Sequence, residues 1–183
     1  MGTSCGLSIG YTICGQGERW KPCQTPESWR RGNEIGVLQM TAHEHPMEYL
    51  LFLKYVNEVD YFEAHEVLEG YWHSDRIDFY KGLIQLAVGL YHLNSGNTAG
   101  FRQLLTRARQ LLTPYAPEFR AMNVSRVLAY VDDCLHKVPN VVEMERDEVQ
   151  KLGVEPIQLW LEDGTPIPDE VPPEFLEGEE ADE

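Results

Sequence analysis

The sequence predicts an all-α protein, a compact bundle of about five helices with a non-helical N-terminal extension and a Pro-rich acidic C-terminal tail. Apolar residues recur at helical spacing in successive segments between residues 40 and 150. Proline, glycine and asparagine separate these segments. Composition changes on both sides of this region, so we expect three parts: residues 1–39, a helical domain at 40–150, and residues 151–183.

Residues 1–39 are rich in Gly, Ser, Thr and Cys and lack apolar residues at helical spacing. Three of the chain's four cysteines fall here at intervals of nine residues, which matches no CxxC-type metal spacing. Two interpretations remain open: a disordered extension, or a translation start placed upstream of the true one. On either interpretation we expect this segment to be dispensable for folding.

The first three helices are predicted from Pro46 onwards. Pro46 suits the start of a helix, and the residues after it up to Val56 supply an apolar face. Residues 57–60 make a turn, and the second helix begins at Tyr61 and closes at "HSD". The third, from about residue 76 to 94, is apolar on nearly every side, so we expect it to be the central, buried helix.

Breaker residues separate the remaining helices. Gly96 is expected to end the third helix, and Asn97 or Thr98 to cap the fourth. The fourth helix carries apolar residues on one face and arginines elsewhere, and "TPYAP" ends it. The fifth helix runs from about residue 123 to 137 and stops before Pro139.

The last part, residues 151–183, has no basic residue after Lys151 and ends in acids. Ile157, Leu159 and Leu161 occupy alternate positions, so this stretch is expected to lie extended against the bundle. The remainder is expected to be a solvated, disordered acidic tail.

Charge and hydropathy exclude several classes of function. A net charge of −15 and a pI near 4.7 argue against a nucleic-acid partner, whose phosphates call for Lys and Arg. No apolar run approaches the roughly 20 residues that span a membrane. Ten Arg against five Lys suit a high-salt cytoplasm, and also an ordinary acidic protein. We expect a cytoplasmic monomer or homodimer, with a small polar ligand as a candidate partner.

The stretch "YFEAHEVLEGYW" carries the most informative polar residues. Projected as a helix, it gathers its large apolar residues on one side, with His65 and Glu69 at the centre of that side and Glu66 at its edge. The apolar residues are Tyr61, Phe62, Leu68 and Trp72. A buried imidazole and carboxylate must satisfy each other, bind water or bind an ion, because an unpaired buried charge is costly.

The third helix carries a seam of polar residues and glycines at spacings of four and three: Asp78, Gly82, Gln85, Gly89 and His92. Each glycine costs about 1 kcal/mol relative to alanine, which favours a close approach by another helix or a ligand. If the second and third helices fold back on each other about Ser74, Glu69 lies level with Asp78. His65 then lies level with Gly82, one turn from Gln85.

Two interpretations of this cluster stay open. In the first, His65, Glu69 and His92 bind a divalent cation, Zn, Mn or Fe, whose bound water becomes a hydroxide nucleophile. Glu66 or Asp78 then accepts the proton. The sequence is HExxE and not the HExxH of zinc proteases. In the second interpretation, Glu69 and Gln85 hold His65 in a structural polar network, and the protein is a non-catalytic binding or scaffold module.

Two blocks, "DYFEAHEVLEGYW" and "FYKGLIQLAVGLYHLNSGNTAGFRQLL", make residues 47 to 138 resemble the prokaryotic family catalogued as domain of unknown function 309. The resemblance implies a compact all-α bundle, which some classifications label a predicted metal-dependent hydrolase without an established reaction. One departure is Lys81, where the family often has Gln. The family's marked positions map to His65, Glu66, Glu69, Trp72, Gly82, Gln85, His92, Gly96 and Asn97.

Overall fold

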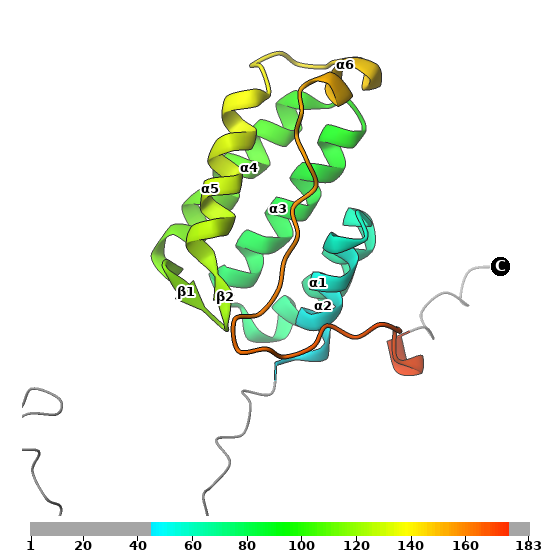
Figure 1. Cartoon of the computed structure of the whole chain (residues 1–183), viewed down its shortest axis with the longest axis vertical. Coiled ribbons are helices and arrows are strands. Elements are labelled where there is room, and N and C mark those ends of the chain that lie inside the picture. Colours follow the sequence, from blue (N-terminus) through cyan, green and yellow to red (C-terminus); the bar gives the residue numbers. More distant parts are fainter. Residues whose placement is uncertain (1–44, 176–183) are drawn as a thin grey trace, which may run out of the picture. The chain divides into compact units, whose positions relative to one another are not determined.

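The computed structural model describes residues 45–175, and the predictions for residues 1–39 and for the end of the tail lie outside that range. Five main helices form the bundle (Figure 1), so the predicted all-α fold is confirmed. Their bounds are α1 (Met47–Asn57), α2 (Tyr61–Asp75), α3 (Asp78–Asn94), α4 (Thr98–Leu112) and α5 (Val124–Lys137). Among the described residues, no helix is long and apolar enough to cross a membrane.

Shorter elements connect or follow these helices. A 3-10 turn, η2 (Thr113–Tyr115), and a two-stranded antiparallel hairpin, β1 (Glu118–Phe119) with β2 (Met122–Asn123), join α4 to α5. The helix α6 (Arg146–Lys151) follows α5, and the 3-10 turn η3 (Pro173–Phe175) comes last. The sequence did not predict the hairpin, because its two-residue turn has no glycine or asparagine. Arg120 and Ala121 nevertheless adopt positive φ angles of 50° and 58° there.

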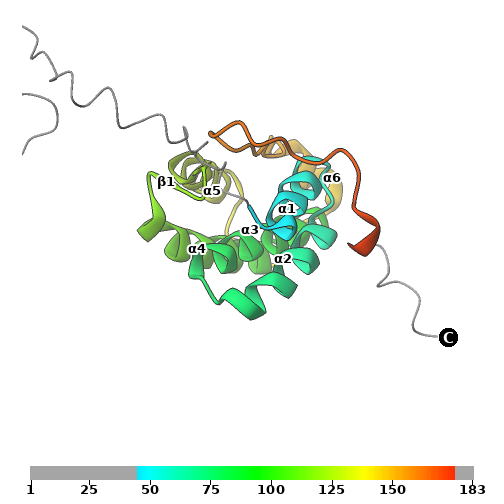
Figure 2. The ribbon, with the colours of Figure 1, turned by 90° about the horizontal axis from the view of Figure 1, so that it is seen from below.

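The helix α3 is the central element, as its uniformly apolar sequence predicts. Figure 2 shows α3 between α4 on one side and the α1–α2 pair on the other. The side chains of Phe79, Tyr80, Leu83 and Leu86 on α3 are fully buried. This helix therefore supplies the middle of the hydrophobic core, and the other helices are positioned by packing against it.

The glycines of α3 allow α4 to approach closely. A Cβ atom added at Gly82 would lie 2.7 Å from Cγ of Leu112, and one added at Gly89 would collide with Cδ1 of Leu105. Both leucines are on α4 and fully buried. Of the two explanations that the sequence allows for these glycines, close packing of a neighbouring helix is therefore the one the structure supports.

The end of α3 and the start of α4 are capped as predicted. Gly96, with φ of +84°, ends α3, and the Asn97 side chain accepts a hydrogen bond of 2.9 Å from the Gly100 N–H at the start of α4. Asn123 caps α5 in the same way. Gly96 and Asn97 together fix the corner at which α3 ends and α4 begins, and Asn123 fixes the start of α5.

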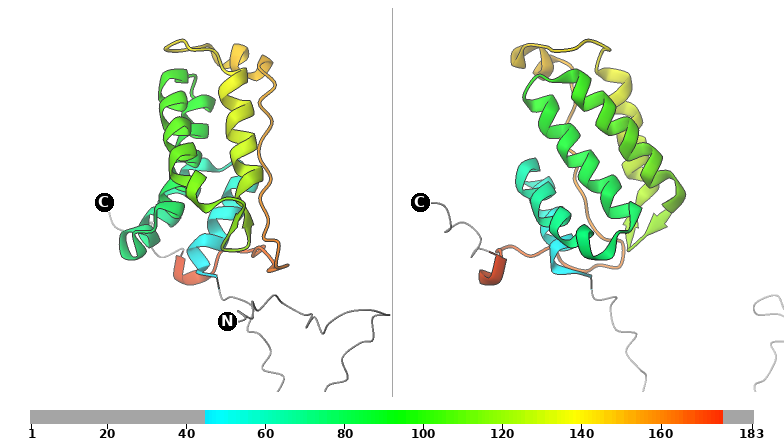
Figure 3. Two further views of the ribbon diagram at one scale, coloured as in Figure 1. Left: turned by 90° about the vertical axis from the view of Figure 1, so that its left-hand side faces the viewer. Right: turned by 180° about the vertical axis from the view of Figure 1, so that it is seen from behind.

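Beyond α6, residues 153–163 run extended over the bundle, along the face where α1 and α5 lie (Figures 1 and 3). We call this segment the strap. Ile157, Leu159 and Leu161 are each no more than 5% exposed, whereas Gln158 and Trp160 face solvent. The alternation in the sequence therefore corresponds to an extended segment with one side in the core.

Candidate functional site

The helices α2 and α3 are antiparallel, and two contacts fix how their residues align. The rings of Phe62 and Tyr91 lie 6.1 Å apart, and Nζ of Lys81 lies 4.9 Å from the Trp72 ring centroid. Interpolating between these contacts places His65 level with Val88.

The alignment expected from the sequence, with His65 level with Gly82, is therefore wrong. That expectation put the turn near Ser74, whereas α2 continues to Asp75 and α3 begins only at Asp78. When the turn falls later in the sequence, each residue of α2 lies level with a later residue of α3. Every expected pair between the two helices therefore changes.

The buried side of α2 also differs from the one expected. It runs through Tyr61, Ala64 and Leu68, which are at most 5% exposed. The side chain of His65 is 19% exposed and that of Glu69 is 44% exposed, so the cluster lies at the edge of the interface and is not buried. The projection misplaced the core because it gave no weight to the small Ala64.

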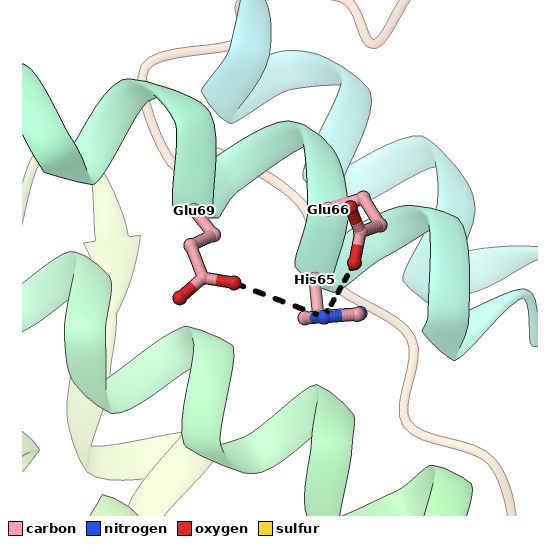
Figure 4. Close-up of side chains that lie close together, drawn as sticks. All are labelled: His65, Glu66 and Glu69. Carbon is pink, nitrogen blue, oxygen red and sulfur yellow. Dashed lines mark ion pairs between the residues drawn. The ribbon is translucent and has the colours of Figure 1, made fainter. Parts of the chain in front are cut away.

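Three side chains of α2 nevertheless come together (Figure 4). His65 Nε2 lies 2.8 Å from Glu66 Oε1 and 3.9 Å from Glu69 Oε2. One ligand atom from each of the three residues lies within 4.8 Å of the other two, which is close enough to hold a metal ion. All three residues come from less than two turns of one helix, so the helical backbone alone sets their spacing.

The protons of His65 define the electrostatics of this cluster. Its Nδ1 lies 2.7 Å from the backbone carbonyl oxygen of Phe62, which can only accept, so Nδ1 carries a proton. Its Nε2 lies 2.8 Å from a carboxylate oxygen, which also only accepts when ionised. A proton or a cation between the two atoms satisfies this second contact.

A fourth residue, His73, extends the cluster along α2. Its Nε2 lies 4.0 Å from Glu69 Oε1, and its side chain is 56% exposed. The sequence marks His73 only as part of the "HSD" that closes the second helix. The spacing of four residues from Glu69 was the signal that would have found it.

Glu66 also lines a pocket of about 370 Å³ between α1 and α2. Tyr55, Val67 and Tyr71 contribute apolar surface to this pocket, and Glu48 adds a further acid. The His65–Glu66 pair thus adjoins a concave surface of the size that small ligands occupy.

The structure does not bring His92 into the cluster. His92 is half-buried near the C-terminal end of α3, where its Nδ1 accepts a hydrogen bond of 3.1 Å from Nδ2 of Asn97. Since Asn97 also caps α4, this histidine belongs to the corner between α3 and α4. His92 and Asn97, which were both predicted as site residues, therefore form a structural pair that is separate from the His65 cluster.

The other predicted residues also lie apart from His65. Trp72 is flanked by the guanidinium group of Arg76 at 4.6 Å and by Lys81. Asp78 is exposed in the first turn of α3, where a negative charge is favourable. Gln85 is half-buried on α3, and within the described part of the chain it forms no hydrogen bond with His65 or Glu69.

Fold and site together define a small helical protein with a His–Glu–Glu cluster on the second helix. Residues 49–104 match the model of a family described as "Domain of unknown function (DUF309)". The resemblance expected from the sequence is thus confirmed over that range, which includes the whole cluster and ends within α4. No solved structure matches the chain.

Two curated proteins are similar to this chain. An uncharacterized protein of Bacillus subtilis, YpuF, is 47% identical over 57 residues, which are 29% of this chain and 33% of the relative. An uncharacterized protein of Aquifex aeolicus is 28% identical over 83 residues, 43% of this chain and 25% of the relative. The matches therefore span a third or less of the length of these relatives, and neither name states an activity.

Proposed function

We propose that this protein binds a divalent metal ion through His65, Glu66 and Glu69. The observation that supports the proposal is the convergence of one imidazole nitrogen and two carboxylate oxygens within 4.8 Å. A mixed nitrogen and oxygen set suits Zn, Mn or Fe better than Ca, which prefers oxygen alone. The cluster also lies within the residues that match the family.

The present geometry is close to what such an ion requires. Zinc–ligand distances of about 2.0–2.2 Å place tetrahedral ligand atoms about 3.4 Å apart. The two contacts of His65 Nε2, at 2.8 and 3.9 Å, lie on either side of that value. Both glutamate side chains are about half exposed, so they are free to rotate toward the ion. The Phe62 carbonyl supports the site by fixing the proton of His65 on Nδ1, which leaves Nε2 as the ligand atom.

The reaction class that fits this site best is hydrolysis. Three protein ligands leave a coordination position for water, as in catalytic metal sites. A divalent ion held there would activate that water as a Lewis acid. Glu66 lines the pocket between α1 and α2, so a substrate bound in the pocket would adjoin the site. In this proposal Glu66 is the third ligand, and His92 has no part.

The alternative is a non-catalytic helical module in which a doubly protonated His65 simply pairs with the glutamates. The 2.8 Å contact with Glu66 supports this alternative, because it satisfies both groups without a metal. All partners belong to α2, however, so the pairs do not hold α2 against α3. Half-exposed pairs within one helix contribute only about 0.3–0.5 kcal/mol. A purely structural role would therefore contribute little.

Isothermal titration of untagged protein with Zn²⁺, Mn²⁺ and Fe²⁺ tests the proposal. We expect one site that is lost in His65→Ala and weakened at least tenfold in Glu69→Gln. His136→Ala is the matched control, since His136 is exposed on α5. Equal binding by wild type and His65→Ala would reject the site.

A further inference from the structure

The pocket between α1 and α2 combines carboxylates with aromatic rings. Three glutamates line it: Glu48 on α1, and Glu63 and Glu66 on α2. Among the described residues that form its walls there is no lysine, arginine or histidine. Its walls also include three aromatic rings, those of Tyr55, Tyr71 and Phe175. Cations pair with carboxylates and with the faces of aromatic rings, so this combination favours an organic cation as the ligand.

The pairing of residues across α1 and α2 gives the pocket two ends. At one end, burial and the carboxylate of Glu63 raise the pKa of Tyr55, so these two residues lie close together. At the other end, Glu48 lies close to Tyr71 in the same way. Tyr71 follows Glu66 by five residues, which is about 7.5 Å along the helix axis. A short alkyl chain therefore spans the distance from Glu66 to the end formed by Glu48 and Tyr71.

The Glu48–Tyr71 end adjoins buried oxygen atoms that lack a hydrogen-bond partner. The ring of Tyr71 packs 5.2 Å from that of Tyr80, whose buried hydroxyl has no partner in the described part of the chain. Oδ2 of Asp75 is buried and unpaired in the same way. Burial and the Asp75 carboxylate raise the pKa of Tyr71, against the opposing effect of the exposed Arg120, so Asp75 also lies near this end. An ionised carboxylate only accepts hydrogen bonds, whereas an ammonium group offers three donors.

Gly70 leaves open space in the wall of the pocket. It lies inside α2, where a glycine costs about 1 kcal/mol relative to alanine. A Cβ atom added there would meet nothing within 4 Å, whereas Gly82 and Gly89 are needed for the close packing of α4. No neighbouring helix therefore requires a glycine at position 70. The space beside it is available to a ligand in the pocket.

We propose that this pocket is a subsite for an alkylammonium group, and that the substrate of the hydrolysis proposed above carries such a group. The ammonium group binds at Glu48 and Tyr71, and the alkyl chain passes Gly70. The bond to be hydrolysed then lies beside Glu66. The assignment of this reacting end rests on the proposed function, because it takes Glu66 as a metal ligand. Binding of the ammonium group itself requires neither the metal nor His65, which does not line the pocket.

Titration of metal-free, full-length protein with n-pentylammonium chloride, followed by NMR, tests the subsite. We expect saturable shifts of amide resonances in α1 and α2, and no saturation with the neutral 1-pentanol. Glu48→Gln should weaken binding about tenfold, because a charge-assisted hydrogen bond is lost. Glu118→Gln, which removes the same charge at an exposed position of the hairpin, is the matched control and should bind as wild type does. Equal affinity of Glu48→Gln and wild type would overturn the proposal, and so would equal binding of 1-pentanol.

A second variant, Gly70→Leu, fills the pocket without removing a charge. It should abolish pentylammonium binding while helical circular dichroism stays at the wild-type level, because the added side chain meets no neighbour. Undiminished binding by this folded variant would place the ammonium group elsewhere and reject the subsite.

The variant His65→Ala separates this inference from the metal site. It should lose Zn²⁺ binding and keep the pentylammonium affinity of the wild type. If the wild type binds pentylammonium but not Zn²⁺, the metal site alone is rejected. If it binds Zn²⁺ but not pentylammonium, the ammonium subsite alone is rejected.

Discussion

His45 Nε2 lies 2.8 Å from Asp163 Oδ2, although 118 positions separate the two residues in the chain. The imidazole side chain is 1% exposed, and its ring packs 5.7 Å from that of Tyr49. The pair joins the residue before Pro46 to the end of the strap. Its hydrogen bond, together with that from the Thr165 N–H, lowers the pKa of Asp163 to about 2.

This lowered pKa predicts a pH dependence of stability with a definite sign. The unfolded chain binds a proton at Asp163 near its ordinary pKa of 3.8, whereas the folded chain resists protonation until about pH 2. The contribution of Asp163 to the free energy of unfolding is therefore complete above pH 4 and declines as the pH falls from about 4 to 2.

Urea unfolding at several pH values measures this contribution. The difference in stability between wild type and Asp163→Asn should be largest above pH 4 and shrink below it. Glu162→Gln, at the exposed neighbouring position, is the control and should give a smaller, flatter difference. If the difference in stability between wild type and Asp163→Asn were the same at every pH, the His45–Asp163 pair would not be a cause of the pH dependence.

The close approach of α3 and α4 at Gly82 leads to a second prediction, which concerns stability. Gly82→Ala should lower stability by about 1–3 kcal/mol, because its Cβ overlaps the fully buried Leu112. Gly70→Ala on α2 is the matched control, since a Cβ there meets nothing within 4 Å. Removing that glycine should raise stability by up to about 1 kcal/mol. Thermal unfolding should therefore show a lower midpoint temperature for Gly82→Ala and a higher one for Gly70→Ala than for the wild type. If both variants were stabilised equally, the close packing of Gly82 against Leu112 would be contradicted.

Asn97 has two roles that substitutions can separate. Asn97→Ala removes both the cap of α4 and the hydrogen bond to His92, and should cost about 1 kcal/mol or more. Asn97→Asp keeps an oxygen for the cap and should retain most of the stability. Neither substitution should change metal binding, because His92 lies outside the His65 cluster. A loss of metal affinity in Asn97→Asp would show that His92 contributes to the metal site.

The local features of this protein were predictable from its sequence. Apolar periodicity predicted the five main helices, and the residues of the His65 cluster were named because neighbours on one helix are fixed by its geometry. The caps at Gly96 and Asn97 follow from local chemistry as well.

Relationships between segments were harder to predict. The alignment of α2 with α3 depends on where one turn falls, and an error near Ser74 changed every expected pair. His45 and Asn57 carry no local sign of their partners, which lie in the strap more than a hundred residues away. Such contacts depend on tertiary packing, which a single sequence does not reveal.

The most direct test of the central proposal is the anomalous X-ray scattering of crystals grown with Zn²⁺, measured on both sides of the zinc absorption edge. The proposal predicts one strong peak about 2.0–2.2 Å from His65 Nε2 and from a carboxylate oxygen of Glu69. Crystals of His65→Ala grown in the same way should lack that peak. No peak at His65 in the wild type, or a peak that persists in the variant, would contradict the metal site.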